Sequence, residues 1–270
     1  MEREIFSIHA ELEPRHWWFR ARRSIVRQLI EQLVPPRTGA LVADAGCGTG
    51  GTLGALEDGY RCVGVDPTPE AIALAQKHFP SIDFRTGFAP DDLADVVGDV
   101  KVVTMLDVLE HVKDDAGLLA AMVRSLRPGS FLVLTVPADM RLWSPSDVVY
   151  GHHRRYDRAG FERLWADLPV RARLVSHFNS RLYPLVRAAR LANRLRGKTA
   201  GHAGTDLALP PAPANYALER IFAGEAATLR DALAGRKPGF RFGVSLIAVL
   251  EVLADPAAPA ARAARPVLVA

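Results

Sequence analysis

Short apolar runs alternate with amphipathic segments along most of this chain. Apolar, β-branched runs typical of buried parallel strands occupy residues 41–45, 62–65, 82–84, 100–106 and 131–136. Helical patterns separate these runs at residues 69–78, which begin with Pro69 and Glu70, and at residues 115–125, which end before a proline and a glycine. This βαβ order predicts an α/β fold, a parallel sheet with helices on both faces.

The pattern continues after residue 137 with one long interruption. A helix is predicted at residues 158–166, a strand at 171–177 and a late apolar strand at 242–252, which makes seven candidate strands. Between the last two strands lie a basic amphipathic helix, a Gly/Pro-rich stretch and a further helix, at residues 182–196, 197–213 and 215–233. The Ala/Pro-rich composition after residue 255 predicts a disordered tail.

Composition limits the classes of protein to consider. A chain of 270 residues, 49% hydrophobic, suits one α/β domain with an insertion. Two cysteines form neither a disulfide framework nor a metal-ligand spacing, so we expect no metal and a reducing cytoplasm. The first thirty residues lack the apolar core of a signal peptide.

The net charge of +4 is spread unevenly along the chain, with arginines concentrated around residues 15–27, 154–158 and 181–196. Such clusters suit anionic substrates or phospholipid headgroups, although solvated helix faces explain them equally well. Aromatic and basic residues are not interleaved as a single-strand binding surface requires, so no nucleic-acid partner is expected.

The richest motif follows the first apolar run, where residues 44–51 read Asp-Ala-Gly-Cys-Gly-Thr-Gly-Gly. Glycines after a strand let a ligand approach the backbone at the start of the next helix. Gly46, Gly48 and Gly51 also fit a dinucleotide fingerprint, with Asp66 twenty residues on. Asp44 separates the two possibilities, because a carboxylate there would repel a pyrophosphate and would suit a ligand ammonium group.

The string from Asp44 to Gly50 resembles the first motif of class I S-adenosylmethionine-dependent methyltransferases. Residues 105–112, Met-Leu-Asp-Val-Leu-Glu-His-Val, closely match that family's fourth-strand pattern, and residues 127–130 fit its next turn, with Ser130 where a second glycine is usual. The resemblance implies a Rossmann-like, seven-stranded methyltransferase sheet that is mostly parallel, with the last strand antiparallel between its neighbours. It also implies S-adenosylmethionine as cofactor and S-adenosylhomocysteine as product.

A carboxylate at the end of the second strand can accept both hydroxyls of a ribose, which is the role expected of Asp66, with a helix N-cap as the alternative. The resemblance places adenine beside the segments that follow the second and third strands, and the methionine portion beside the fourth. The cofactor residues predicted in this core are Asp44, Gly46, Cys47, Gly48, Gly50, Asp66, Pro67, Thr68, Phe88, Ala89, Leu106 and Asp107.

Two strings flank the core: His-Trp-Trp-Phe-Arg-Ala-Arg-Arg at residues 16–23 and Gly-His-His-Arg-Arg-Tyr at 151–156. They resemble a bacterial small-molecule subgroup whose members often accompany glycosyltransferases of lipid-linked sugar pathways. Trp18 is predicted to close over the cofactor and Arg22, or Arg20, to meet its carboxylate, with aromatic packing onto the domain as the alternative.

The second string follows the fifth strand, where this fold receives its acceptor. His152 or His153 is predicted as general base, and the predicted acceptor contacts are Arg154, Arg155, Tyr156 and Trp143. The alternative is an ion-pair network with Asp147 and Asp157.

The sequence therefore predicts a methyltransferase that methylates an oxygen of a small or lipid-linked metabolite by in-line transfer. The alternatives are an NAD(P)-dependent oxidoreductase and a non-catalytic cofactor-binding scaffold. The predicted layout is a helical cap (1–38), a cofactor-binding core (39–179), a helical insertion or lid (180–241), the final strand (242–254) and the tail (255–270). The cytoplasm is the expected location, with peripheral membrane contact through the basic helix at residues 182–196.

Overall fold

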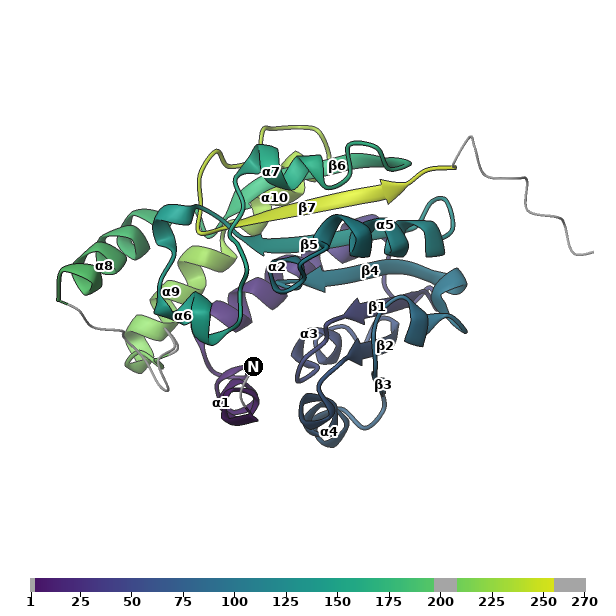
Figure 1. The fold of residues 1–270 in the computed structure, drawn as a ribbon, viewed down its shortest axis with the longest axis horizontal. Helices are drawn as coiled ribbons and strands as arrows, with labels where there is room; N and C mark the ends of the chain where they lie inside the picture. Colours follow the sequence, from purple (N-terminus) through teal and green to yellow (C-terminus); the bar gives the residue numbers. More distant parts are fainter. Residues whose placement is uncertain (1–2, 197–207, 255–270) are drawn as a thin grey trace, which may run out of the picture.

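The computed structural model describes residues 3–196 and 208–254. Within them the strands are β1 (Leu41–Ala45), β2 (Arg61–Asp66), β3 (Asp83–Thr86), β4 (Val100–Leu106), β5 (Phe131–Pro137), β6 (Val170–Phe178) and β7 (Ser245–Val252). All seven form one sheet in the order β3-β2-β1-β4-β5-β7-β6 (Figure 1). Ala248 of β7 pairs antiparallel with Leu134 of β5 and with Val175 of β6. The predicted sheet, with its last strand antiparallel between two neighbours, is confirmed.

The helices are α1 (Arg3–Leu12), α2 (Trp17–Leu33), α3 (Gly51–Gly54), α4 (Pro69–His78), α5 (Asp115–Ser125), α6 (Pro145–Val149), α7 (Arg158–Arg163), α8 (Tyr183–Arg196), α9 (Ala212–Ala223) and α10 (Ala226–Leu233). Short 3-10 turns occupy Asp91–Leu93, Val97–Asp99, Leu109–His111 and Met140–Leu142. None of the helices in the described ranges is long and apolar enough to cross a membrane.

Helices cover both faces of the sheet because successive strand residues point to opposite sides. Val102 faces a core formed with α2, α4, α9 and α10, to which Ile25 and Phe222 contribute. Val103, the next residue, faces a second core formed with α5 and α7, to which Leu119 and Phe161 contribute. The strands between these cores are apolar on both sides, which explains their continuous hydrophobic runs.

The described part of the insertion differs most from its sequence pattern in its second helix, which begins at Ala212. The helix predicted at residues 215–233 is two helices, α9 and α10, with Gly224 and Glu225 between them. Glu225 is buried, and its Oε1 accepts hydrogen bonds of 2.7 Å from the backbone N–H groups of Ser180 and Arg181. The break therefore lies where a carboxylate fixes the beginning of the insertion. Residues 197–207 and the tail at 255–270 lie outside the described ranges.

The parallel strands β1, β2 and β4 end at one edge of the sheet, where Asp66 is the last residue of β2 and where the glycine turn and Asp107 follow β1 and β4. Helices α6, α8 and α9 gather at the left of Figure 1, toward which the parallel strands run, and α1 lies below them. Open α/β sheets bind ligands at this edge.

Candidate active site

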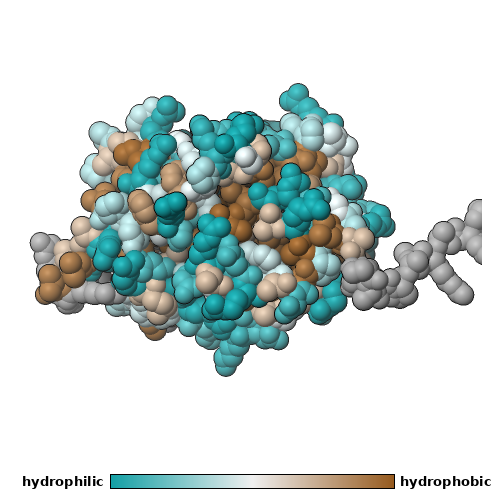
Figure 2. Space-filling view, turned by 90° about the horizontal axis from the view of Figure 1, so that it is seen from above, coloured by the Kyte–Doolittle hydropathy of each residue, from teal (hydrophilic) through white to brown (hydrophobic). Residues whose placement is uncertain are grey.

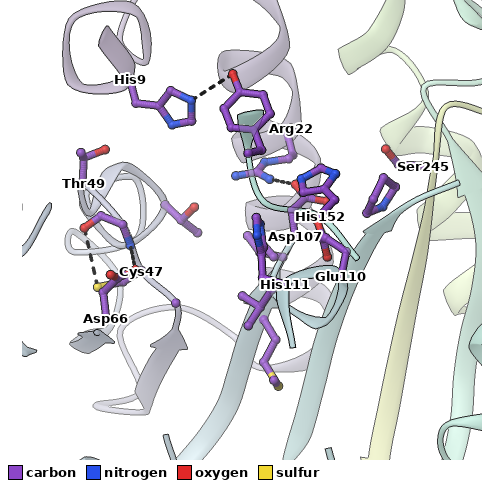
Figure 3. Close-up of a pocket in the computed structure, with 18 of the residues that line it drawn as sticks. His9, Arg22, Cys47, Thr49, Asp66, Asp107, Glu110, His111, His152 and Ser245 are labelled. Carbon is purple, nitrogen blue, oxygen red and sulfur yellow. Dashed lines mark hydrogen bonds and ion pairs between the residues drawn. The ribbon is translucent and has the colours of Figure 1, made fainter. Parts of the chain in front are cut away.

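A cavity of about 750 Å³ lies at the carboxyl edge of the sheet (Figure 3). The glycine turn and the ends of β2 and β4 form one part of its wall, and α1, α2, the loop around α6, and α8 form the rest. Residues from both flanking sequence strings reach it, including Trp18, Arg22, His152 and Arg155. The cavity thus has room for a nucleoside-sized ligand and a second molecule beside it.

The glycine turn opens its backbone toward the cavity. Gly48 has a left-handed φ of +53°, and a Cβ added there would meet no atom within 4 Å. Its N–H donates a 3.0 Å hydrogen bond to Asp66 Oδ2, while the N–H of Thr68 donates one of 2.9 Å to Asp66 Oδ1. Asp66 is thereby fixed at the end of β2, with carboxylate lone pairs still available to ligand hydroxyls.

Asp44 lies beneath this turn and is almost completely buried. Burial raises the pKa of its carboxyl group to about 6, and a 2.6 Å hydrogen bond from the Thr104 hydroxyl offsets part of that effect. Asp66 and Glu13 raise the same pKa further by charge repulsion. The floor of the cavity is therefore acidic, which suits a cationic group and opposes a phosphate.

The three adjacent aromatic residues of α2 point in different directions. Trp18 lines the cavity, with the Arg22 guanidinium 4.6 Å from its ring centre. The ring of Trp17 packs edge-on against Phe222 of α9, and the backbone N–H of Trp17 donates a hydrogen bond to Asn215 Oδ1. Trp18 therefore lies where the predicted cofactor contact requires, whereas Trp17 packs onto α9 as the alternative expects.

Arg22 forms an ion pair with Asp107, the residue after β4 (Figure 3). Asp107 has a left-handed φ of +58°, and the Thr135 hydroxyl donates to it over 3.2 Å. Arg20, the alternative to Arg22, forms an ion pair with Glu219 and does not line the cavity.

His152 and Asp147 form a buried pair on the other side of the cavity. His152 Nδ1 lies 2.9 Å from Asp147 Oδ1, and Arg155 binds both oxygens of the same carboxylate at 2.8 and 3.1 Å. These contacts hold the pKa of Asp147 far below its usual range despite burial. A carboxylate fixed in this way orients the imidazole and stabilises its protonated form.

His111 and Glu110 lie next to His152. The rings of His111 and His152 meet at 81° with centroids 4.8 Å apart. Burial lowers the pKa of His111 to about 4, helped by the neighbouring His152. Glu110 is fully buried, and burial, followed by repulsion from Asp107, raises its pKa well above the ordinary value.

The structure brings most of the predicted residues to this cavity. The predicted cofactor residues that line it are Trp18, Arg22, Asp44, Gly46, Cys47, Gly48, Asp66, Pro67, Thr68, Phe88, Ala89, Leu106 and Asp107. Gly50 lies outside the lining, where it precedes α3 and packs against Phe84.

Of the residues predicted to act on the acceptor, His152 and Arg155 line the cavity. His153 is exposed outside it, and Trp143 is half-buried outside it. Arg154 and the buried Tyr156 both bind Asp115, away from the cavity wall. Of the two adjacent histidines, His152 therefore faces the cavity and His153 does not.

Several lining residues carry no recognisable sequence signal. Glu13, between α1 and α2, accepts a 2.6 Å hydrogen bond from the Thr49 hydroxyl of the glycine turn. His9 of α1 lies 3.4 Å from the Tyr150 hydroxyl across the cavity (Figure 3). Their positions depend on how α1 folds over the sheet edge, which no local pattern specifies.

Comparison with known proteins defines the class. Residues 18–181 match the family of methyltransferase domains, and the chain belongs to this family. It is 34% identical over 102 residues to a ubiquinone biosynthesis O-methyltransferase of Thiobacillus denitrificans, covering 36% of this chain and 44% of that protein. The chain thus spans less than half the length of the curated relatives that it matches.

Solved structures share the fold. The plantazolicin methyltransferase in complex with S-adenosylhomocysteine superimposes with a TM-score of 0.57 at 13% identity, covering 93% of this chain and 90% of that one. A TehB-like S-adenosylmethionine-dependent methyltransferase from Corynebacterium glutamicum gives 0.50 at 18% identity, covering 84% and 86%. Family and fold therefore agree: the chain is a member of the methyltransferase domain family with the Rossmann-like fold of these structures.

The residues present fit this cofactor. Asp66 offers acceptors for ribose hydroxyls, and Gly48 leaves open space beside the turn. The acidic floor at Asp44 suits a cofactor that carries an ammonium and no phosphate. A dinucleotide pyrophosphate would meet that buried carboxylate instead, which disfavours the oxidoreductase alternative.

Proposed function

We propose that this protein transfers the methyl group of S-adenosylmethionine to an oxygen atom of a small, largely apolar acceptor. The observation that carries the proposal is one cavity joining the acidic glycine turn to the His152 and Asp147 pair. The O-methyltransferase name of the curated relative supports oxygen as the acceptor atom.

When bound, S-adenosylmethionine supplies an electrophilic methyl group on a sulfonium. In our proposal Asp66 accepts the ribose hydroxyls, and Asp44 faces the ammonium. Pro67, Phe88 and Ala89 lie where they can contact the adenine. The Phe88 ring is 68% exposed, so the adenine could pack against it. Arg22, paired with Asp107 and stacked on Trp18, lies where it can meet the methionine carboxylate.

His152 is the proton acceptor in this proposal. A bond forms between the acceptor oxygen and the methyl carbon, the carbon–sulfur bond breaks, and the hydroxyl proton passes to the imidazole. Asp147 accepts a hydrogen bond from Nδ1 of His152 in this proposal. The other ring nitrogen, Nε2, is then the one that accepts the proton. Arg155 acts through Asp147 as a positioning residue, because its guanidinium binds both carboxylate oxygens.

A lipid-linked acceptor and peripheral membrane contact belong to the same proposal. Phe6, Trp17 and Val186 contribute to an apolar cavity wall. Val186 and Arg190 of α8 line the cavity, while the opposite side of that helix exposes Leu191 and Leu195. The two flanking strings support membership of the subgroup associated with lipid-linked sugars. Co-sedimentation with vesicles tests the contact.

A pair of histidine variants tests the chemistry. Purified protein is assayed with labelled S-adenosylmethionine against a panel of phenols and isoprenoid alcohols. His152→Asn is expected to reduce kcat by roughly 100- to 10,000-fold, the usual contribution of a general base, with little change in S-adenosylhomocysteine affinity. His153→Asn is expected to keep activity, because that side chain lies outside the cavity. Loss in His153→Asn alone would reassign the base.

Calorimetry separates the alternatives. Absence of S-adenosylhomocysteine binding would refute the proposal, and binding of a reduced nicotinamide cofactor in its place would favour the oxidoreductase. Binding without turnover on any member of the panel would favour the non-catalytic scaffold.

A further inference from the structure

Glu110 and His111 have no part in the proposed methyl transfer, yet they form a cluster with His152 in the cavity wall. Each offers one potential ligand atom, and these three atoms lie within 4.8 Å of one another. Glu110 is fully buried, and neither of its carboxylate oxygens has a hydrogen-bond partner in the structure. A buried carboxylate without partners is costly, and binding a cation is one of the few ways to compensate for it.

We infer that Glu110, His111 and His152 bind one divalent transition-metal ion in the wall of the cavity. Two imidazoles and one carboxylate are the ligands of many zinc sites, and Fe²⁺ and Co²⁺ accept the same set. The residues line the cavity, so an ion held by three protein ligands would keep open positions toward its interior.

The surroundings orient two of the ligands as metal sites require. Asp147 binds Nδ1 of His152, the carboxylate–histidine arrangement that fixes a metal-bound imidazole. Arg155 holds Asp147 in place with two hydrogen bonds. The N–H of His153 donates to the carbonyl of Glu110 over 2.8 Å, which ties the loop carrying His152 to the turn carrying Glu110 and His111.

Distance and charge are compatible with binding. Ligand atoms about 2.1 Å from a shared ion are at most about 4.2 Å apart, so a separation of 4.8 Å closes with a small side-chain rotation. Arg22 and Arg155 are the nearby cations, and each is paired with a carboxylate, Asp107 and Asp147 respectively. Both carboxylate oxygens of Glu110 lack hydrogen-bond partners, so at least one of them can bind the ion without giving up an existing contact.

An ion here would lie on the side of the cavity where the methyl acceptor is proposed to bind, and an acceptor oxygen would suit its open positions. This consequence rests on the proposed function, whereas binding of the ion does not. A ring nitrogen that binds a metal does not accept a proton. His152 would therefore accept the proton only in the metal-free protein, and in the metal-bound protein the ion would lower the pKa of the acceptor hydroxyl in its place.

The test uses Co²⁺ and Zn²⁺ with chelator-treated, full-length protein. Co²⁺ titration followed by visible absorption is expected to give one saturable site with the bands of nitrogen coordination, and calorimetry with Zn²⁺ the same stoichiometry. Glu110→Gln and His111→Asn are expected to abolish the site, and Asp147→Asn to weaken it about 10- to 100-fold. His78→Asn, an exposed histidine on α4, is the matched control and should bind as the unaltered protein does.

Absence of saturable binding by the unaltered protein would overturn the inference, as would unchanged binding in Glu110→Gln and His111→Asn. S-adenosylhomocysteine affinity, measured on every variant, reports whether each has folded, and His111→Asn alone carries the test if Glu110→Gln does not fold. Cofactor binding and methyl transfer without any metal site would remove only this inference. Metal binding without methyl transfer would remove only the proposed function.

Discussion

Asp44 is a buried carboxyl group whose ionisation costs stability when no cation faces it. Burial raises its pKa in the folded protein to about 6, against 3.8 for the ordinary side chain. The folded state therefore keeps its proton between about pH 4 and 6, whereas the unfolded chain loses it. Stability from this residue is complete below pH 4 and falls as pH rises through this window, by about 3 kcal/mol at most.

We expect Asp44→Asn to remove this pH-dependent loss. Without ligand, the variant should gain up to about 3 kcal/mol in free energy of unfolding relative to the unaltered protein between pH 4 and pH 7, because an amide does not ionise. Urea unfolding of both proteins at the two pH values measures the difference. An equal difference at both pH values would contradict the assignment.

The same substitution, although it raises stability, should lower the affinity for the cofactor. Affinity of the unaltered protein for S-adenosylhomocysteine should rise as pH increases through about 6, because the ionised carboxylate attracts the ligand ammonium. Asp44→Asn should bind more weakly and lose this dependence. Calorimetry on both proteins across that range provides the control within the same experiment.

At the scale of elements, the turn before α3 depends on a close approach as well as on backbone conformation. Gly50 has a φ of +82°, and a Cβ there would lie 2.6 Å from Phe84 Cζ. Gly129, in the turn before β5, has a φ of +84° but open space around the same position. Substitutions at these two glycines therefore distinguish the cost of a left-handed φ from the cost of steric overlap.

We expect Gly129→Ala to destabilise the protein by about 1–2 kcal/mol, the cost of a left-handed residue. Gly50→Ala should cost a further 1–3 kcal/mol or so, since Phe84 must also move. Chemical denaturation of both variants measures the free energy of unfolding. Equal losses would show that Phe84 accommodates the methyl group without cost.

Elements defined by local patterns could be predicted from the sequence, and elements fixed by distant contacts could not. The predicted bounds of β1, β4, α4 and α5 agree with the structure, since alternating apolar runs and proline or glycine signals mark their ends. The break between α9 and α10 depends on Glu225 reaching Ser180 and Arg181, forty-odd residues away. No periodicity in the sequence encodes that contact.

The candidate site likewise contains residues that could be placed from the sequence and residues that could not. The glycine turn and Asp66 follow their strands directly, so strand prediction places them. The sequence alone is compatible with Asp147 in a surface ion-pair network, yet its side chain is fully buried and pairs with His152 and Arg155. Only the fold of the loop after β5 distinguishes a surface ion pair from an oriented imidazole.

At the scale of the whole molecule, the proposed membrane contact depends on an exposed apolar stripe of α8. Leu185, Leu191 and Leu195 are 60%, 58% and 81% exposed and share a stripe of about 120° on α8, with Arg187 beside them. Hydrophobic residues are visible at the left edge of Figure 2, where α8 lies in Figure 1. An apolar stripe flanked by arginine is typical of helices that lie in a membrane interface.

We expect the protein to sediment with vesicles rich in anionic phospholipid at low salt, and less so as salt screens the arginines. Replacing Leu191 and Leu195 together by glutamine should weaken binding at least about tenfold, because each leucine contributes roughly 1.5–3 kcal/mol when buried. Val148→Gln, an exposed apolar residue on α6, serves as control. Failure to sediment at low salt would refute the contact.

The position of β7 between β5 and β6 governs how the chain can mature on the ribosome. β5 and β6 emerge early, but the strand that joins them follows the entire insertion. Until then both carry unpaired edges, which are templates for association with other chains. The length of the insertion therefore sets an interval during translation when the nascent protein is open to aggregation through the edges of β5 and β6 that β7 later covers.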